Sequence, residues 1–106
     1  MDCSTWTDNE WKCPEKSILG IKSLIPAVPD FPKPGIIFRD IMPIFQIPRA
    51  VTAVCDLMIS YIETNHASVD AIVGLDARGF LIGPIIAIKL DVSVLFMIIY
   101  PMWLLY

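Results

Sequence analysis

Apolar residues recur along the chain with a helical spacing in two segments. Over residues 49–65, Val51, Val54 and Met58 fall on one face of a helix, and the charged residues of this segment fall on the other. Residues 15–25 show a shorter stripe of the same kind, which ends at a proline. The pattern therefore predicts two amphipathic helices in the first two thirds of the chain.

Later in the chain, two short runs at residues 69–75 and 92–99 are almost continuously apolar and rich in β-branched side chains. Such runs are typical of strands buried on both faces of a parallel sheet. Residues 80–90, which lie between them, predict a helix. The order helix, strand, helix, strand predicts the α/β fold class with a parallel sheet.

Prolines are concentrated between the two predicted helices. Residues 26–35 read PAVPDFPKPG, with four prolines that are incompatible with a helix or the interior of a sheet. A proline-rich connection is extended and stiff. The following residues, 35–41, fit either a short edge strand or a loop.

The composition and net charge of the chain limit the kinds of partner that it is expected to bind. The 106 residues suffice for one small domain, and 56% of them are hydrophobic. The formal net charge of −3 gives no support to binding of nucleic acid or of an anionic membrane surface. The polar first residues do not resemble a secretory signal. We expect residues 1–14 to form a poorly ordered N-terminal extension.

The three cysteines, Cys3, Cys13 and Cys55, form an odd set without the spacing of a metal site. We therefore expect free thiols, a cytoplasmic location and no protein-bound metal. Cys55 is expected to be a small core residue. His66 lies at the end of a predicted helix without a catalytic motif around it, so we expect it to have a surface role.

The last segment, residues 92–106, carries no charge and reads VSVLFMIIYPMWLLY. It is shorter than the roughly 20 apolar residues that a membrane-spanning helix needs, and Pro101 interrupts it. A membrane location is therefore the less favoured interpretation. A buried strand followed by a divergent hydrophobic tail at residues 96–106 is the favoured one.

The run GLDARGFLIGP places polar residues between a predicted strand and a predicted helix. Ligands of parallel sheets bind at such junctions, where the helix N-terminus favours an anion. Arg78 adds a guanidinium that suits phosphate oxygens, and Gly79 permits close approach of the backbone. The pattern predicts a phosphate or pyrophosphate site. The alternative is that Asp76 and Arg78 form a plain surface ion pair.

A second unusual run, FPKPGIIFRDIMPIF, brings Phe38, Arg39 and Asp40 together directly after the prolines. Phe38 could stack on a planar base. The other interpretation is that Phe38 is a core residue and that the two charged side chains are solvated.

The runs DFPKPGIIFRDI and GLDARGFLIGP, in this order and separated by IPRA and CDLMISYI, resemble the adenine phosphoribosyltransferase family. The resemblance covers roughly residues 16–95 and corresponds to the N-terminal half of that family's chains. It favours the base-stacking role for Phe38 over the core role. Residues 15–95 are accordingly expected to form a partial phosphoribosyltransferase domain.

The resemblance implies a type I phosphoribosyltransferase fold and the conversion of adenine and phosphoribosyl pyrophosphate to AMP and pyrophosphate. It further implies Mg²⁺ held with the substrate phosphates, cytosolic purine salvage and a homodimer. The residue roles that it implies are adenine binding by Ile37 and Phe38, a position near the phosphates for Arg39, and a pyrophosphate loop at Asp76, Ala77, Arg78 and Gly79. In that family the Asp76–Ala77 peptide would be cis.

The chain departs from the family after residue 95. The family's acidic pair followed by a Thr- and Gly-rich turn, which binds the 5′-phosphate, does not occur in these 106 residues. No catalytic residue is therefore assigned, and we expect the chain by itself to be an inactive, truncated form. Two alternatives remain: a non-catalytic splice product that pairs with and modulates the full-length enzyme, and a membrane-associated protein using residues 92–106.

Overall fold

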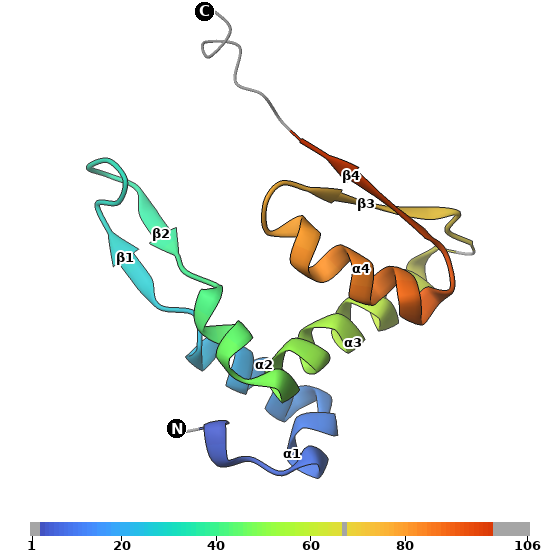
Figure 1. Cartoon of the computed structure of the whole chain (residues 1–106). Coiled ribbons are helices and arrows are strands. Elements are labelled where there is room, and N and C mark those ends of the chain that lie inside the picture. The colour runs from blue at the N-terminus through green and yellow to red at the C-terminus, as the bar shows by residue number, and fades with distance from the viewer. Residues whose placement is uncertain (1–2, 67, 99–106) are drawn as a thin grey trace, which may run out of the picture. The chain divides into compact units, whose positions relative to one another are not determined.

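The computed structural model describes residues 3–66 and 68–98 of the chain. These residues divide into two compact units, with the division between Val54 and Cys55 inside one long helix. The elements are shown in Figure 1. The first unit contains η1 (Cys3–Thr5), α1 (Asp8–Lys12), α2 (Pro14–Ser23), β1 (Ala27–Pro29), β2 (Ile37–Arg39), η2 (Met42–Gln46) and the beginning of α3 (Pro48–Asn65).

Local signals in the sequence explain the short N-terminal helices. Thr7 caps α1, and its backbone N–H donates to the Glu10 carboxylate at 2.7 Å. Proline occupies the first position of α2, where its missing N–H has no helical partner to lose. The helix predicted over residues 15–25 is therefore confirmed as α2, with slightly different ends.

The core of the first unit includes residues from the segment that we expected to be poorly ordered. Cys3 and Trp11 are buried, and the Trp6 and Trp11 rings lie 5.0 Å apart. A Cβ atom added at Gly20 would lie only 2.9 Å from the Trp11 ring, so α2 packs closely on this indole. We expected residues 1–14 to be poorly ordered, whereas the structure shows helices and buried side chains from Cys3 onwards. The free energy gained by burying the Trp11 side chain outweighs the effect of the polar residues around it.

The proline-rich segment forms one arm of an antiparallel hairpin. Strands β1 and β2 pair in the register Ala27 with Arg39, Val28 with Phe38 and Pro29 with Ile37. Proline is tolerated here because the hairpin has only edge strands. The expected extended backbone is confirmed, and the open choice between strand and loop is decided in favour of strand β2.

The second unit contains the rest of α3, followed by β3 (Ala71–Leu75), α4 (Gly79–Leu90) and β4 (Ser93–Met97). Strands β3 and β4 are parallel, with Ala71 opposite Ser93 and Leu75 opposite Met97. Helix α4 forms the crossover between them and ends at Leu90, followed by the C-cap residue Asp91, whose φ is +56°. The predicted order of helix, strand, helix and strand and the parallel sheet are confirmed.

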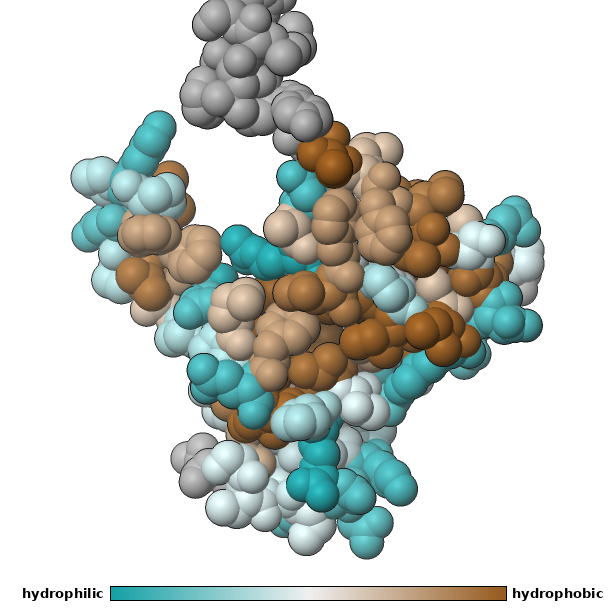
Figure 2. Space-filling view, viewed as in Figure 1, coloured by the Kyte–Doolittle hydropathy of each residue, from teal (hydrophilic) through white to brown (hydrophobic). Residues whose placement is uncertain are grey.

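The two parallel strands are less buried than the sequence predicted. Helix α4 covers the face that carries Ile72, Gly74 and Val94. Alternation along a strand places the next side chains on the opposite face, and there Val73 and Leu95 remain 50% and 56% exposed. The expectation of fully buried strands is therefore wrong for the described residues. Figure 2 shows apolar side chains on the surface around these strands.

Two further expectations concern the cysteines and the C-terminal residues. Cys55 is fully buried, as predicted, and burial raises the pKa of its thiol. The cysteines of the described residues form no disulfide. Phe96 and Met97 belong to β4, whereas residues 99–106 of the predicted tail lie outside the described residues. Among the described helices, none has the length and apolar character needed to cross a membrane.

Candidate active site

The loop between β3 and α4 contains the predicted anion-binding residues. Leu75 ends the strand and Gly79 begins the helix, so three residues make the connection. Asp76, Ala77 and Arg78 are all exposed. The loop follows the carboxyl end of β3, the position where parallel sheets bind their ligands.

Backbone hydrogen bonds fix the course of this loop. The Asp76 N–H donates to the Met97 carbonyl at 3.0 Å, which extends the pairing of β3 with β4. The Phe80 N–H donates to Ala77 at 3.1 Å and the Leu81 N–H donates to Arg78 at 3.0 Å. The peptide between Asp76 and Ala77 is cis, as the family resemblance implied.

Two glycines bring the strand and the helix into backbone contact. A Cβ atom added at Gly74 would lie 2.7 Å from the carbonyl oxygen of Gly79. A Cβ atom added at Gly79 would lie 3.1 Å from the carbonyl carbon of Gly74. Only glycine fits at such a distance without a backbone shift. The first turn of α4 is therefore seated directly on the end of β3.

The electrostatic character of the loop favours an anion. Arg78 is the N-cap residue of α4, whose first turn carries no acidic side chain. The positive end of the helix dipole and an exposed guanidinium therefore lie at the same corner. Two first-turn amides, those of Phe80 and Leu81, already donate within the turn. The amides of Ala77 and Gly79 and the Arg78 side chain belong to the same loop.

The predicted adenine-binding residues lie together on strand β2 of the first unit. Ile37 is 62% exposed, Phe38 is half-buried and Arg39 is exposed. The Phe38 ring contacts the Phe31 ring edge-on, with centroids 5.2 Å apart. Phe38 is thus not a fully buried core residue.

Asp40, which follows these residues, has a structural role. Its carboxylate accepts a hydrogen bond from the Met42 N–H at 3.0 Å, and its own N–H donates to the Pro26 carbonyl at 3.1 Å. The first contact starts helix η2 and the second ties the end of β2 to the start of β1. Asp40 therefore sets the direction in which the chain leaves the hairpin.

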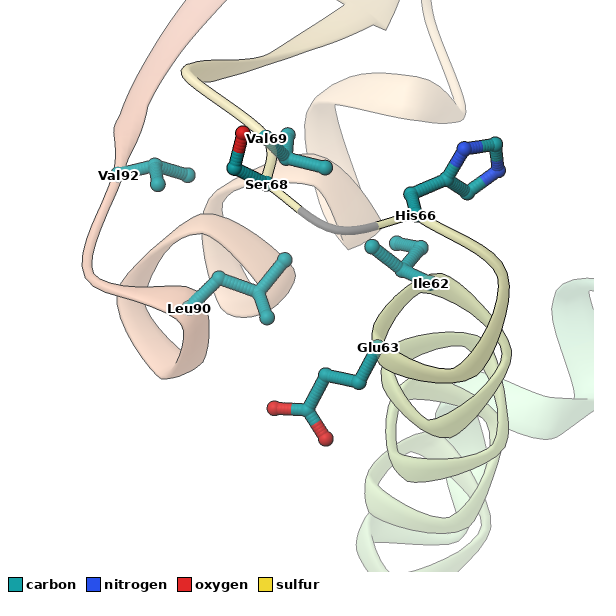
Figure 3. A pocket seen from close by; sticks show the side chains of 7 residues that line it. All are labelled: Ile62, Glu63, His66, Ser68, Val69, Leu90 and Val92. Carbon is teal, nitrogen blue, oxygen red and sulfur yellow. The ribbon is translucent and has the colours of Figure 1, made fainter.

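Two cavities lie within the second unit. One has a volume of about 240 Å³ and is apolar except for Arg78 at its border. The other, of about 170 Å³, is lined by Glu63, His66 and Ser68 together with four aliphatic side chains (Figure 3). In Figure 3 the Glu63 carboxylate and the His66 ring point in different directions. These groups do not converge on one reacting atom, which agrees with the surface role expected for His66.

No protein-built metal site is found in the described part of the chain. Residues 3–66 and 68–98 contain no group of three or more His, Cys, Asp or Glu side chains that could hold a metal ion. Any divalent cation at the loop would therefore need most of its ligands from a bound substrate or from water.

Comparison with known proteins shows which proteins the matched segment is similar to. No protein-family model matches the chain. Adenine phosphoribosyltransferase from Ectopseudomonas mendocina is 56% identical over 72 residues, which are 67% of this chain and 38% of that protein. The matched segment is homologous to adenine phosphoribosyltransferases. The chain spans 38% of the length of this curated relative.

Solved structures of adenine phosphoribosyltransferases share the fold. The Saccharomyces cerevisiae enzyme, in complex with adenine and an imino-altritol bisphosphate, is 33% identical with a TM-score of 0.73. The match covers 80% of this chain and 52% of the yeast chain. The Giardia lamblia enzyme in complex with 9-deazaadenine is 31% identical with a TM-score of 0.67, over 76% of this chain and 44% of that chain. The predicted family resemblance and the type I phosphoribosyltransferase fold are confirmed.

Two residues with structural importance for these sites were not singled out in the sequence. Gly74 seats the helix on the strand, and Phe31 contacts the predicted base-stacking residue. A glycine inside a β-branched run is a recognisable sign of close backbone approach. The sequence contained no comparable sign for Phe31, because a phenylalanine among prolines has many possible partners.

The Gly74 contact leads to a prediction about stability. Gly74→Ala should lower the free energy of unfolding by about 1–3 kcal/mol, because the added methyl group must displace backbone atoms. Gly83→Ala is the matched control, since its Cβ would lie at ordinary contact distances of 3.7–3.8 Å and would favour the helix. Denaturant titration followed by circular dichroism measures both. Equal stability of the two variants would contradict the close seating of α4.

Proposed function

We propose that this chain carries the adenine and pyrophosphate sites of an adenine phosphoribosyltransferase. The reaction joins adenine to the ribose of phosphoribosyl pyrophosphate, giving AMP and pyrophosphate. Ile37 and Phe38 bind adenine, and Arg39 lies near the substrate phosphates. Asp76, Ala77, Arg78 and Gly79 form the pyrophosphate loop.

The observation that carries this proposal is the construction of the β3–α4 corner. An exposed arginine caps a helix whose first turn is seated on the end of a parallel strand. This combination of a fixed backbone, a helix N-terminus and a guanidinium suits a diphosphate. Sequence identity of 56% with a bacterial adenine phosphoribosyltransferase over 72 residues supports the same ligand.

The proposed chemistry uses the loop in the bond-breaking step. A ring nitrogen of adenine forms a bond to the anomeric carbon of the ribose while the bond from that carbon to pyrophosphate breaks, and the proton that this nitrogen carried passes to solvent. Negative charge gathers on the departing pyrophosphate. The amides of Ala77 and Gly79 and the charge of Arg78 stabilise it, because they are already oriented before the reaction.

The base is held by strand β2 in this proposal. Adenine stacks on the accessible part of the Phe38 ring, and Ile37 contributes apolar contact and backbone groups. The yeast relative binds adenine in its solved complex, which supports the assignment of the base.

Mg²⁺ accompanies the substrate in this scheme. The described residues offer no cage of three or more ligating side chains, so the phosphate oxygens of phosphoribosyl pyrophosphate supply the principal ligands. The ion neutralises phosphate charge when it is bound. We further propose a cytoplasmic location, which the free thiols favour, and a homodimer.

Two single variants test the assignment of the two ligands. Arg78→Ala should weaken binding of pyrophosphate about 10- to 100-fold, because a charge-assisted contact is lost. Phe38→Ala should weaken binding of adenine about 5- to 100-fold, because a stacking surface is lost. Isothermal titration calorimetry with each ligand measures both effects. Arg49→Ala is the control, since this exposed arginine pairs with Asp8 and belongs to neither proposed site.

The expected pattern is reciprocal: each variant loses one ligand and keeps the other, and Arg49→Ala keeps both. Unchanged affinity of Arg78→Ala for pyrophosphate would contradict the loop assignment. Unchanged affinity of Phe38→Ala for adenine would contradict the base assignment.

Catalysis by these 106 residues by themselves is not part of the proposal. The sequence contains no acidic pair followed by a Thr- and Gly-rich turn, which in the family binds the 5′-phosphate. Incubation of the purified chain with labelled adenine, phosphoribosyl pyrophosphate and Mg²⁺ should therefore give no AMP. AMP formation that disappears in Arg78→Ala would show that the chain is active without that turn.

A second candidate function is a non-catalytic partner that pairs with and modulates a full-length subunit. It is favoured by the exposed apolar face of the β3–β4 sheet, where Val73, Leu75, Leu95 and Met97 are 47–56% exposed. Exposed apolar surface of this kind favours association.

Co-expression of the chain with a full-length adenine phosphoribosyltransferase tests this second function. It predicts a mixed complex in size-exclusion chromatography with light scattering, which Leu95→Lys abolishes because it charges the apolar face. Lys12→Ala, an exposed substitution on α1, should leave the complex intact. Separate elution of the two proteins would contradict the pairing.

A further inference from the structure

The hairpin of the first unit contains an aromatic pair that burial does not explain. Phe31 is 50% exposed, so its ring is not part of a hydrophobic core. It nevertheless contacts the Phe38 ring with centroids 5.2 Å apart and an interplanar angle of 70°. This is the edge-to-face geometry that aromatic pairs prefer. Because Phe31 remains half exposed, the contact does little to bury it. Its main effect is to restrain the orientation of the Phe38 ring.

The backbone around Phe31 is tied in place at several points. The Phe31 N–H donates to the Ile36 carbonyl at 3.1 Å, and the Gly35 N–H donates to the Asp30 carboxylate at 2.9 Å. Asp30 and Gly35 both have positive φ values, of 55° and 87°, which turn the chain back on itself. The loop is thereby closed, and Phe31 is presented towards strand β2.

Strand β2 is tied down as well. Phe38 lies opposite Val28 in the antiparallel register, and the hairpin is closed at its other end by the Asp40 N–H and the Pro26 carbonyl. With the backbone of both phenylalanines fixed, the remaining freedom of Phe38 is rotation of its side chain. The Phe31 ring restricts that rotation through direct contact.

We propose that Phe31 is a positioning residue for adenine, which holds the Phe38 ring in the plane that stacks on the base. The inference rests on the proposed adenine-binding function of Phe38. A pre-oriented ring loses less side-chain entropy when the base binds, so affinity rises without a direct contact from Phe31. Phe31 then affects the adenine site specifically and has no role in binding pyrophosphate.

The test compares three substitutions in the full 106-residue chain by calorimetric titration with adenine and, separately, with inorganic pyrophosphate. Phe31→Leu keeps an apolar side chain but loses the ring, and should weaken adenine binding about two- to tenfold. Phe31→Tyr keeps the aromatic ring and should bind adenine with the affinity of the wild type. Ile36→Ala is the matched control, an equally apolar loop residue with 45% exposure, and should leave adenine binding unchanged.

The readouts separate positioning from loss of structure. Backbone amide resonances of residues 27–39 should keep their positions in Phe31→Leu outside the immediate neighbourhood of the substitution, and pyrophosphate affinity should not change. Nuclear Overhauser contacts between the Phe31 and Phe38 rings should be present in the wild type and retained in Phe31→Tyr. Collapse of the hairpin resonances in Phe31→Leu would assign Phe31 a structural role and overturn the inference.

The inference and the proposed function fail in different ways. If the wild type binds adenine, Phe38→Ala abolishes binding and Phe31→Leu equals the wild type, the inference is wrong and the proposed function stands. If the wild type binds no adenine, or Phe38→Ala binds it normally, the proposed role of Phe38 is wrong and the inference falls with it.

Discussion

The contact between the backbones of Gly74 and Gly79 is the constraint on which the β3–α4 corner depends. A Cβ atom at Gly74 would lie 2.7 Å from the Gly79 carbonyl oxygen, and one at Gly79 would lie 3.1 Å from the Gly74 carbonyl carbon, so a side chain at either position requires movement of the backbone. This contact sets where α4 begins, and the start of α4 sets where Arg78 and the loop amides lie. The proposed anion binding at the corner therefore depends on how closely α4 packs on the end of β3.

In the hairpin, too, contacts between neighbouring segments fix the position of a proposed ligand-binding residue. Here hydrogen bonds at both ends of the β1–β2 pair, together with an edge-to-face aromatic contact, hold a half-exposed ring in a fixed orientation. Both candidate sites thus present their ligand-binding groups on short segments whose backbone is fixed by neighbouring contacts. Fixed groups lose little entropy on binding and need little rearrangement during reaction.

Much of this arrangement could be predicted from the sequence, and the remainder depends on contacts between distant residues. The apolar stripe at Val51, Val54 and Met58 predicted α3, and the runs around Ile72 and Val94 predicted the parallel strands. The exposure of Val73 depends on which elements cover each face of the sheet, and an apolar run alone does not reveal this. Burial of Trp11 could not be decided from the sequence because its partners, such as Gly20, are brought to it by folding. Asp76 and Arg78 could be singled out as site candidates because their polarity interrupts an apolar pattern, whereas Phe31 was not singled out.

The central claim, that the β3–α4 loop binds a diphosphate, can be tested directly by backbone amide resonances during titration of the chain with pyrophosphate. The account predicts saturable shifts concentrated at Ala77, Arg78 and Gly79, with the hairpin resonances of residues 27–39 unaffected. Shifts that are absent, that do not saturate, or that are spread over exposed lysines elsewhere in the chain would contradict it.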